Sequence, residues 1–296
     1  MIYVLMIIVF IDVFNYLFIK TGLISGGITY SYRRTKLIVM FATVVIVSMC
    51  AIGGYVRFCN PEVVKYPVEI NKKVTTPVKI VIASDLHLGY LINKKITKNF
   101  VDFINAQQPD IVLFVGDIID RSMRPLYAEK MYEELRNIKA NIGVFGVWGN
   151  HEKYVKNDSI VKDFYSQSHI ILLQDERIDL TPDIVLVGRD DYKNRQRDSL
   201  NSLLDGVDTS KIILVLDHQP SAANEAIKNN ADILLCGHTH KGQVFPLNYV
   251  VSMMYKYSYG YKKVNKTNII VSSGLGLCGG LFRIGTQSEI VVLNVE

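Results

Sequence analysis

The segment "LLCGHTHKGQ", residues 234–243, places His238 and His240 two positions apart, directly after an apolar run and a glycine. In an extended chain, side chains two residues apart point to the same side. Two imidazoles that face one way at the end of a strand suggest a metal site. A polar turn that happens to contain two histidines is the alternative, and this segment alone leaves both open.

Similar polar groups follow four other short apolar runs. They are Asp85 and His87 in "SDLHLG", Asp117 and Asp120 in "GDIIDR", Asn150, His151 and Glu152 in "GNHE", and His218 in "DHQP". Five of the six histidines therefore lie at such positions, and only His169 does not. Histidines scattered over surface turns would not be expected to gather in this way. The pattern predicts a metal site built from several loops.

The apolar runs predict the elements that position these groups. Five runs are short, rich in β-branched residues and bounded by turn residues, which is typical of buried strands: residues 78–84, 110–116, 142–149, 211–217 and 232–237. Helical patterns fill the gaps, at 93–107, 126–139, 157–168 and 219–230. Because ligands of open α/β sheets gather at the carboxyl ends of strands, we expect the polar groups to meet at one edge.

Further strands are expected without helices between them, at 183–188, 268–273, 281–285 and 288–295. Strand–helix alternation followed by strand-rich segments predicts an α/β domain. Its sheet is either one large mixed sheet or two packed sheets flanked by helices.

The polar motifs, taken in order, resemble those of the calcineurin-like metallophosphoesterases: Asp-x-His, Gly-Asp-x-x-Asp, Gly-Asn-His-Glu, His and Gly-His-x-His. The resemblance covers roughly residues 78–295. The stretches "GHTHKGQVFP", "YSYGYKK", "VSSGLG" and "FRIGTQSEIVVL" are similar to its membrane-anchored bacterial branch of YaeI/YkuE type. The resemblance implies a four-layer α/β/β/α sandwich and hydrolysis of phosphate esters, with phosphodiesters favoured.

The same resemblance implies two divalent metal ions held by seven side chains. One ion is assigned to Asp85, His87, Asp117 and His240, and the other to Asp117, Asn150, His218 and His238, with Asp117 shared. This mixture of nitrogen and oxygen ligands suits Mn²⁺, Fe²⁺/³⁺ or Zn²⁺ and is poor for calcium. Paired metals of this kind orient a phosphoryl group and activate a water molecule.

His151 has no ligand role in this pattern, so we expect it to protonate the leaving oxygen. Asp120 and Glu152 are expected to orient metal ligands or His151, although Glu152 would also be consistent with a plain surface carboxylate. Arg189 follows a strand and is a candidate substrate contact or part of a solvated loop. Arg283 is a candidate phosphate contact or an ordinary structural ion pair.

Two apolar stretches precede the expected domain, at about 2–19 and 37–56, and each is long enough to cross a bilayer as a helix. A pair of buried core helices is the alternative. The loop between them contains Lys20, Arg33, Arg34 and Lys36 and no acid, which places it in the cytoplasm and both chain ends outside. The expected organisation is therefore a transmembrane hairpin in residues 1–56, a proline-containing linker at 57–77 and a metallophosphoesterase domain at 78–296.

The 296 residues carry a formal net charge of +5, spread along the chain, so no basic block indicates nucleic acid. The four cysteines form no C-x-x-C pair, and neither a zinc ribbon nor a disulfide framework is indicated. The segment 249–263 interleaves aromatic residues with lysines, as an interfacial or substrate-gripping loop does, with ordinary loop packing as the alternative.

Together these features predict a phosphoesterase of the bacterial cytoplasmic membrane whose catalytic domain faces outside. Its expected substrates are phosphodiesters of lipid or envelope components. A cytosol-facing pyrophosphatase for a UDP-linked acylated sugar of lipid A synthesis is one alternative. A non-catalytic, phosphate-binding membrane scaffold is an alternative of a different class.

Overall fold

The structure, a computed structural model, describes residues 32–296, so the first expected membrane span at 2–19 lies outside the described part. Helix α2 (Tyr32–Cys59) contains the second expected span. Its portion Met40–Cys59 is long and apolar enough to cross a membrane, and it is the one such helix among the described residues. Residues 56–296 form a separate compact unit.

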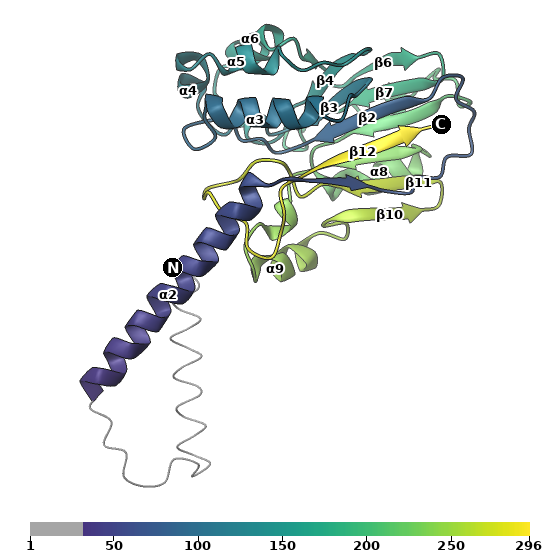
Figure 1. Ribbon diagram of the computed structural model, residues 1–296. Coiled ribbons are helices and arrows are strands. Elements are labelled where there is room, and N and C mark those ends of the chain that lie inside the picture. Colours follow the sequence, from purple (N-terminus) through teal and green to yellow (C-terminus); the bar gives the residue numbers. More distant parts are fainter. Residues whose placement is uncertain (1–31) are drawn as a thin grey trace. The chain divides into compact units, whose positions relative to one another are not determined.

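The compact unit contains two six-stranded sheets (Figure 1). The first sheet has the order β1 (Glu62–Lys65), β12 (Glu289–Val295), β2 (Val78–Ala83), β3 (Ile111–Val115), β4 (Gly143–Val147) and β5 (Ile171–Leu172). The second has the order β10 (Gly260–Val264), β11 (Thr267–Val271), β9 (Ile233–Cys236), β8 (Ile212–Leu216), β7 (Ile184–Gly188) and β6 (Glu176–Thr181). Strands β2–β5 are mutually parallel, as are β7, β8, β9 and β11.

Side-chain alternation along each strand explains why the central strands are almost entirely apolar. In β2, Ile80 and Ile82 belong to the core between the sheets, whereas Val81 and Ala83 face the opposite side. Leu214 and Leu216 of β8 enter the same inter-sheet core from the second sheet. Strands buried on both faces must be apolar at nearly every position, which is the pattern seen in the sequence.

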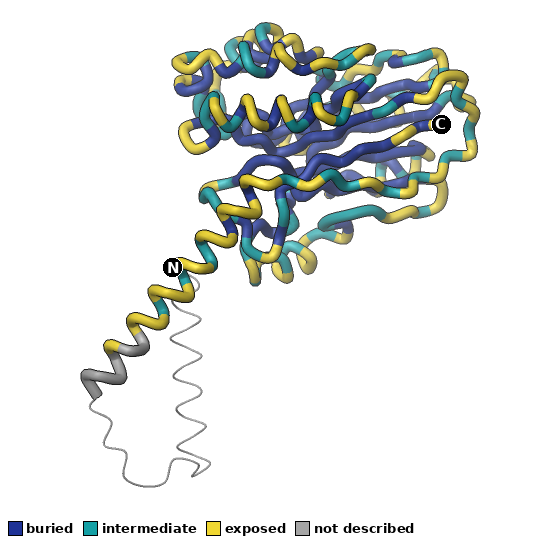
Figure 2. Tube along the Cα trace, viewed as in Figure 1, coloured by how far each residue is buried: buried dark blue, intermediate teal, exposed yellow. Residues whose placement is uncertain are grey.

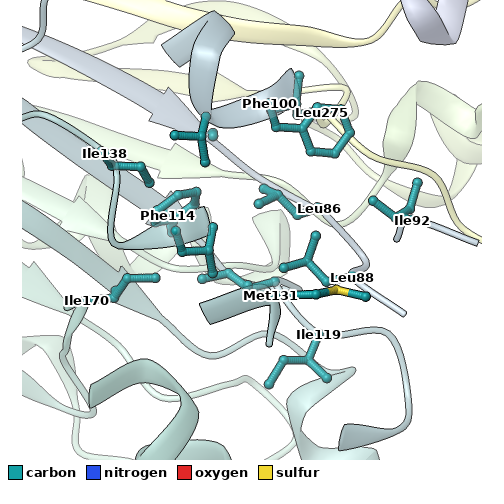
Figure 3. Packing of buried hydrophobic residues seen from close by; sticks show 14 of the residues in the cluster. Leu86, Leu88, Ile92, Phe100, Phe114, Ile119, Met131, Ile138, Ile170 and Leu275 are labelled. Atoms are coloured by element: carbon teal, nitrogen blue, oxygen red, sulfur yellow. The ribbon is translucent and has the colours of Figure 1, made fainter. Parts of the chain in front are cut away.

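Helices cover the outer face of each sheet. The first sheet packs against α3 (Lys94–Asn105), α4 (Met123–Ala128), α5 (Met131–Leu135) and α6 (Asp158–Gln167). Figure 3 shows part of this packing, in which Phe114 of the sheet belongs to one cluster with Phe100 of α3, Met131 of α5 and loop residues such as Leu86. The second sheet packs against the shorter helices α7 (Leu200–Leu203) and α8 (Ala223–Lys228). The expected four-layer α/β/β/α arrangement is confirmed.

Several expected elements differ in the structure. The helix expected at 126–139 is divided into α4 and α5, because Lys130 between them adopts a left-handed conformation with φ of 51°. The helix expected at 219–230 begins as the 3-10 turn η2 (Pro220–Ala222). The prediction of a strand at 281–285 is wrong. In this segment Ile284 forms only an isolated bridge with Val244. Gly285, with φ of 79°, takes the chain out of the extended conformation there.

The segment expected as a linker, 57–77, lies along the sheets. Its strand β1 pairs in parallel with β12. Tyr66, Val68 and Ile70 then pack against the inter-sheet core. This segment is therefore part of the packed unit.

The inter-sheet core generates a stability prediction. Leu214→Ala should lower the free energy of unfolding by about 2–5 kcal/mol, because Leu214 is fully buried there and its removal leaves a cavity. Tyr90→Ala is the control, since Tyr90 is 71% exposed and its loss should change stability by about 0.5 kcal/mol or less. Urea unfolding of the detergent-solubilised chain measures both, and an equal loss in the two variants would contradict the two-sheet core.

Candidate metal centre

The polar groups singled out from the sequence follow five strands at their carboxyl ends. Asp85 and His87 follow β2, Asp117 follows β3, Asn150 and His151 follow β4, His218 follows β8, and His238 and His240 follow β9. The strands β2, β3 and β4 run parallel in one sheet, and β8 and β9 run parallel in the other. The two sheets therefore deliver these side chains to one shared edge.

A first cluster consists of Asp85, His87 and His240, and one donor atom from each lies within 4.8 Å of the others. His87 Nε2 lies 3.0 Å from His240 Nε2, and His240 Nε2 lies 3.4 Å from Asp85 Oδ1. All three side chains are buried. Two ring nitrogens and a carboxylate that converge in this way have the donor types of a divalent metal site.

A second cluster consists of Asp117, His218 and His238, again with donor atoms within 4.8 Å of one another. His218 Nδ1 lies 2.7 Å from the carbonyl oxygen of Val115, which fixes the proton on Nδ1 and leaves Nε2 facing the cluster, 3.2 Å from Asp117 Oδ2. Burial alone would lower the pKa of His218, but the Asp117 carboxylate outweighs it and raises that pKa to about 10.

Asp117 lies between the two clusters. Its Oδ2 is 3.2 Å from His218 Nε2 and 3.9 Å from His87 Nε2, so one carboxylate faces both groups of ligands. Its other oxygen, Oδ1, accepts a hydrogen bond from the backbone N–H of His151 at 2.8 Å. This position is the one that a shared ligand would need.

Unsatisfied atoms test whether metal ions fit the site. Among the described residues, four atoms of these side chains are buried without a hydrogen-bond partner: His87 Nδ1, Asn150 Oδ1, His218 Nε2 and His240 Nδ1. Buried polar groups are normally satisfied, because leaving them without a partner costs about 1–3 kcal/mol each. A cation beside Asn150 Oδ1 and His218 Nε2 would satisfy both, so the residues present fit a metal.

Glu152 links the loops of the first sheet that carry candidate ligands. Its buried carboxylate accepts backbone N–H groups from Asp117 at 3.1 Å, Ile119 at 3.0 Å and Gly149 at 2.8 Å. Burial, followed by the neighbouring Asp117 carboxylate, raises the pKa of Glu152 to about 7. Glu152 is thus a buried residue that orients Asp117, and a surface role for it is excluded.

His151 is oriented by Asp120. Its Nδ1 lies 2.7 Å from the Asp120 carbonyl oxygen and 3.1 Å from Asp120 Oδ1, while Nε2 lies on the cluster side, 4.0 Å from Asp117 Oδ2. Burial would lower the pKa of His151, but the hydrogen bond that His151 donates to the Asp120 carboxylate outweighs it and, with smaller contributions, raises the pKa to about 11. A protonated imidazole held at the edge of the clusters is suited to donate a proton.

Two residues near the site were not predicted as site residues, although Tyr255 lies in the aromatic and lysine-rich segment 249–263. Cys278 groups with His87 and His151, with donor atoms within 4.8 Å of one another. The Tyr255 hydroxyl lies 3.0 Å from His238 Nε2. Neither residue follows a strand or belongs to a recurrent metal motif, so only the tertiary fold reveals them.

The two arginines considered as substrate contacts are buried. Arg189 is 2% exposed and donates hydrogen bonds to Glu225 at 3.1 Å and to the Asp198 carbonyl at 2.7 Å. Arg283 is fully buried, and its Nη2 donates to the carbonyl oxygens of Ser273, Gly274 and Gly276. Both arginines fix loops around the site.

The loops that carry the candidate ligands are strained. Asp85, His87, Asp117, His238 and His240 all have φ between 49° and 72°. Non-glycine residues rarely adopt this left-handed region, and such strain persists where the surrounding structure enforces it, often at functional sites. Here it is enforced by backbone bonds between loops, such as Asp85 N–H to Gly116 O and His87 N–H to Asp117 O, both 3.0 Å.

The loops after β3 and β4 approach each other so closely that Gly149 of the Gly-Asn-His-Glu motif has no room for a side chain. A Cβ added at Gly149 would overlap Asp117 Oδ1, and 2.7 Å would separate it from the Asp117 backbone nitrogen. Gly149→Ala should therefore displace Asp117 and weaken Mn²⁺ binding by about 10–100-fold, the range typical for residues that orient ligands. Gly89→Ala is the matched control, because its added Cβ meets nothing closer than 3.4 Å. Calorimetric Mn²⁺ titration compares them, and equal affinity would show that the approach does not position Asp117.

Comparison with known proteins agrees with this geometry. Residues 78–242 match the calcineurin-like phosphoesterase family. An uncharacterized metallophosphoesterase of Campylobacter jejuni is 31% identical over 80% of this chain and 64% of its own length. A zebrafish (Danio rerio) transmembrane protein with metallophosphoesterase domain is 31% identical over 88% of this chain and 62% of its own.

The uncharacterized metallophosphoesterase YkuE of Bacillus subtilis is 27% identical over 89% of this chain and 97% of its own. The chain spans less than two thirds of the length of the Campylobacter and zebrafish relatives. With the family's motifs gathered at the edge shared by its two sheets, the chain belongs to the calcineurin-like phosphoesterase family.

Proposed function

We propose that this protein is a membrane-anchored, two-metal phosphoesterase that hydrolyses phosphodiesters of lipid or envelope components. The observation that carries the proposal is the convergence of two three-residue clusters, joined by the Asp117 carboxylate, with Asn150 Oδ1 buried without a hydrogen-bond partner and His218 Nε2 buried 3.2 Å from Asp117 Oδ2. Family membership supports phosphate-ester hydrolysis in general. The two-metal mechanism and the diester preference are parts of the proposal.

In this proposal Asp85, His87 and His240 hold one metal ion, Asn150, His218 and His238 hold the other, and Asp117 contacts both. Manganese, iron and zinc are the candidate metals for this nitrogen and oxygen set. When bound, such a pair supplies Lewis-acid activation of water and neutralises charge on the phosphoryl group. The chain's own contribution is to hold the ligand loops rigid through Glu152 and the bonds between loops.

His151 supplies the proton for the leaving oxygen in this proposal. Asp120 holds its Nδ1, so the proton on Nε2 is presented toward the clusters. A non-catalytic scaffold would have no need of an imidazole that a neighbouring residue orients toward the clusters. The orientation of His151 therefore supports an enzyme over a silent phosphate-binding protein.

Activity measurements separate the roles of Asp117 and His151. The purified full chain with Mn²⁺ should hydrolyse bis(p-nitrophenyl) phosphate. Asp117→Ala should abolish both metal binding and hydrolysis, because both clusters lose a ligand. His151→Ala should retain the metal and lower turnover by about 100-fold or more, which is the usual contribution of a general acid.

Asp102→Ala is the control for removal of a carboxylate. The Asp102 side chain is exposed on α3, so its loss should change neither metal binding nor hydrolysis. Full hydrolytic activity in Asp117→Ala would overturn the two-metal proposal. Unchanged turnover in His151→Ala would show that His151 is not the general acid, while the metal assignment would stand.

The proposal also states how the protein is anchored in the membrane and on which side of the membrane its catalytic domain lies. Helix α2 contains one candidate span, and the zebrafish relative is named a transmembrane protein. We infer a second span at 2–19 and a cytoplasmic loop that carries Lys20, Arg33, Arg34 and Lys36. The domain would then face outside, where lipid headgroups, lipid-linked sugar phosphates and envelope polymers are accessible.

Cysteine labelling tests the proposed side. In a chain with Cys50, Cys59 and Cys278 changed to serine, Thr76→Cys places a single accessible thiol on the domain, since Cys236 is buried. A membrane-impermeant maleimide should label it in intact cells, with the envelope permeabilised where an outer membrane is present. Ser25→Cys, in the loop between the spans, is the matched control and should react only after the cytoplasmic membrane is broken.

The opposite pattern would place the domain in the cytosol. The envelope substrates would then be excluded, and the activity would have to be sought among cytosolic substrates such as a UDP-linked acylated sugar of lipid A synthesis.

A further inference from the structure

Helix α9 (Leu247–Met254) is an apolar helix without a buried residue. It exposes Leu247, Tyr249, Val250, Met253 and Met254, and Met253 reaches 80% exposure. Figure 2 shows this helix largely in the exposed colour, in contrast to the buried strands. Exposed apolar clusters of this kind mark surfaces that are covered by a partner or a membrane.

The charges around α9 favour an anionic partner. Residues 233–288 contain five lysines and one arginine and no aspartate or glutamate. The arginine is buried, so the surface charge comes from the lysines. Lys256 and Lys262 are exposed, and their Nζ atoms lie 5.3 and 5.9 Å from the centre of the Tyr257 ring. Lysines and tyrosines beside an apolar helix are the composition of segments that lie in a membrane interface.

The start of α9 and the end of α2 are held by the same short segment. Backbone N–H of Phe245 donates to the Ile284 carbonyl at 2.7 Å. Three residues further on, Gln287 Nε2 donates to the carbonyl oxygens of Arg57 and Asn60, at 3.1 and 2.6 Å. Residues 284–287 therefore tie α9 to the point where the candidate membrane span enters the compact unit.

The far end of α9 reaches the metal centre. Tyr255 directly follows the helix, and its hydroxyl lies 3.0 Å from His238 Nε2. Thr239, next to His238, donates a hydrogen bond to the Ser258 carbonyl at 2.6 Å. A surface that covers α9 would thus lie beside the rim of the clusters.

We propose that α9 inserts into the interfacial layer of an anionic lipid bilayer and presents the metal centre to phosphate esters held in that bilayer. The insertion is independent of catalysis, whereas the presentation of substrate rests on the proposed function. The bilayer is the occupant that accounts for the apolar side chains, the lysine-rich surroundings and the shared attachment with α2.

Fluorescence quenching tests the insertion in the full chain. The protein is reconstituted in vesicles of equal parts phosphatidylglycerol and phosphatidylcholine, with bromine atoms on carbons 6 and 7 of the phosphatidylcholine acyl chains. Met253→Trp places a tryptophan on α9. The native Trp148 is fully buried and supplies a constant background, measured with the unchanged chain.

Ile142→Trp is the matched control. Ile142 is also apolar and is 41% exposed, but it precedes β4, at the end of the strand opposite the ligand loops. The tryptophan at position 253 should be quenched at least threefold more than the one at position 142. Adding Met254→Asp beside Met253→Trp should remove most of this difference.

Equal quenching at the two positions would overturn the proposal, because α9 would then face water or another protein, including a second copy of this chain. The readout does not depend on turnover. An inactive protein with strong quenching at position 253 would therefore contradict the proposed function and leave the insertion standing.

Discussion

The site depends on the position of Asp117, where loops from both sheets meet. Its backbone N–H is held by Glu152, its backbone carbonyl accepts from His87, and its carboxylate bonds the backbone of His151 while facing His218. These contacts link Asp117, after β3, to the loops that follow β2, β4 and β8. Since the carboxylate is buried and faces both clusters of candidate ligands, a displacement of any one of these loops would disturb both clusters.

Much of this arrangement follows from the sequence, because the carboxyl ends of parallel strands lie at the same edge of a sheet. Apolar runs identified β2, β3, β4, β8 and β9, and the residues after each run identified the polar groups that the structure brings together. What the sequence could not provide are contacts made across the fold. Cys278 and Tyr255 reach the site from segments with no metal motif, and β1 is a four-residue strand that is stabilised by pairing with β12 and by packing of Val63 and Val64 against the cores.

The two arginines show a related limit. Their positions after or near strands were compatible with substrate contact, yet both guanidinium groups are buried and bind carbonyls or carboxylates of neighbouring loops. A guanidinium is costly to bury, and the neighbouring loops supply acceptors for part of each group: Arg283 Nη2 is bonded, whereas Arg283 Nε and Nη1 are buried without a hydrogen-bond partner. The conformation of the loops around the site therefore depends partly on these two buried guanidinium groups. The exposed apolar surface of α9 lies beside the same rim, so the ligand loops and the helix that we propose to insert into the bilayer are close to each other.

Anomalous X-ray diffraction from crystals of the full chain grown with Mn²⁺ tests the central claim most directly. Our account predicts two anomalous peaks at the carboxyl edge of the sheets, one contacted by Asp85, His87 and His240, the other by Asn150, His218 and His238, and both by Asp117. A single peak, or peaks away from Asp117, would contradict it.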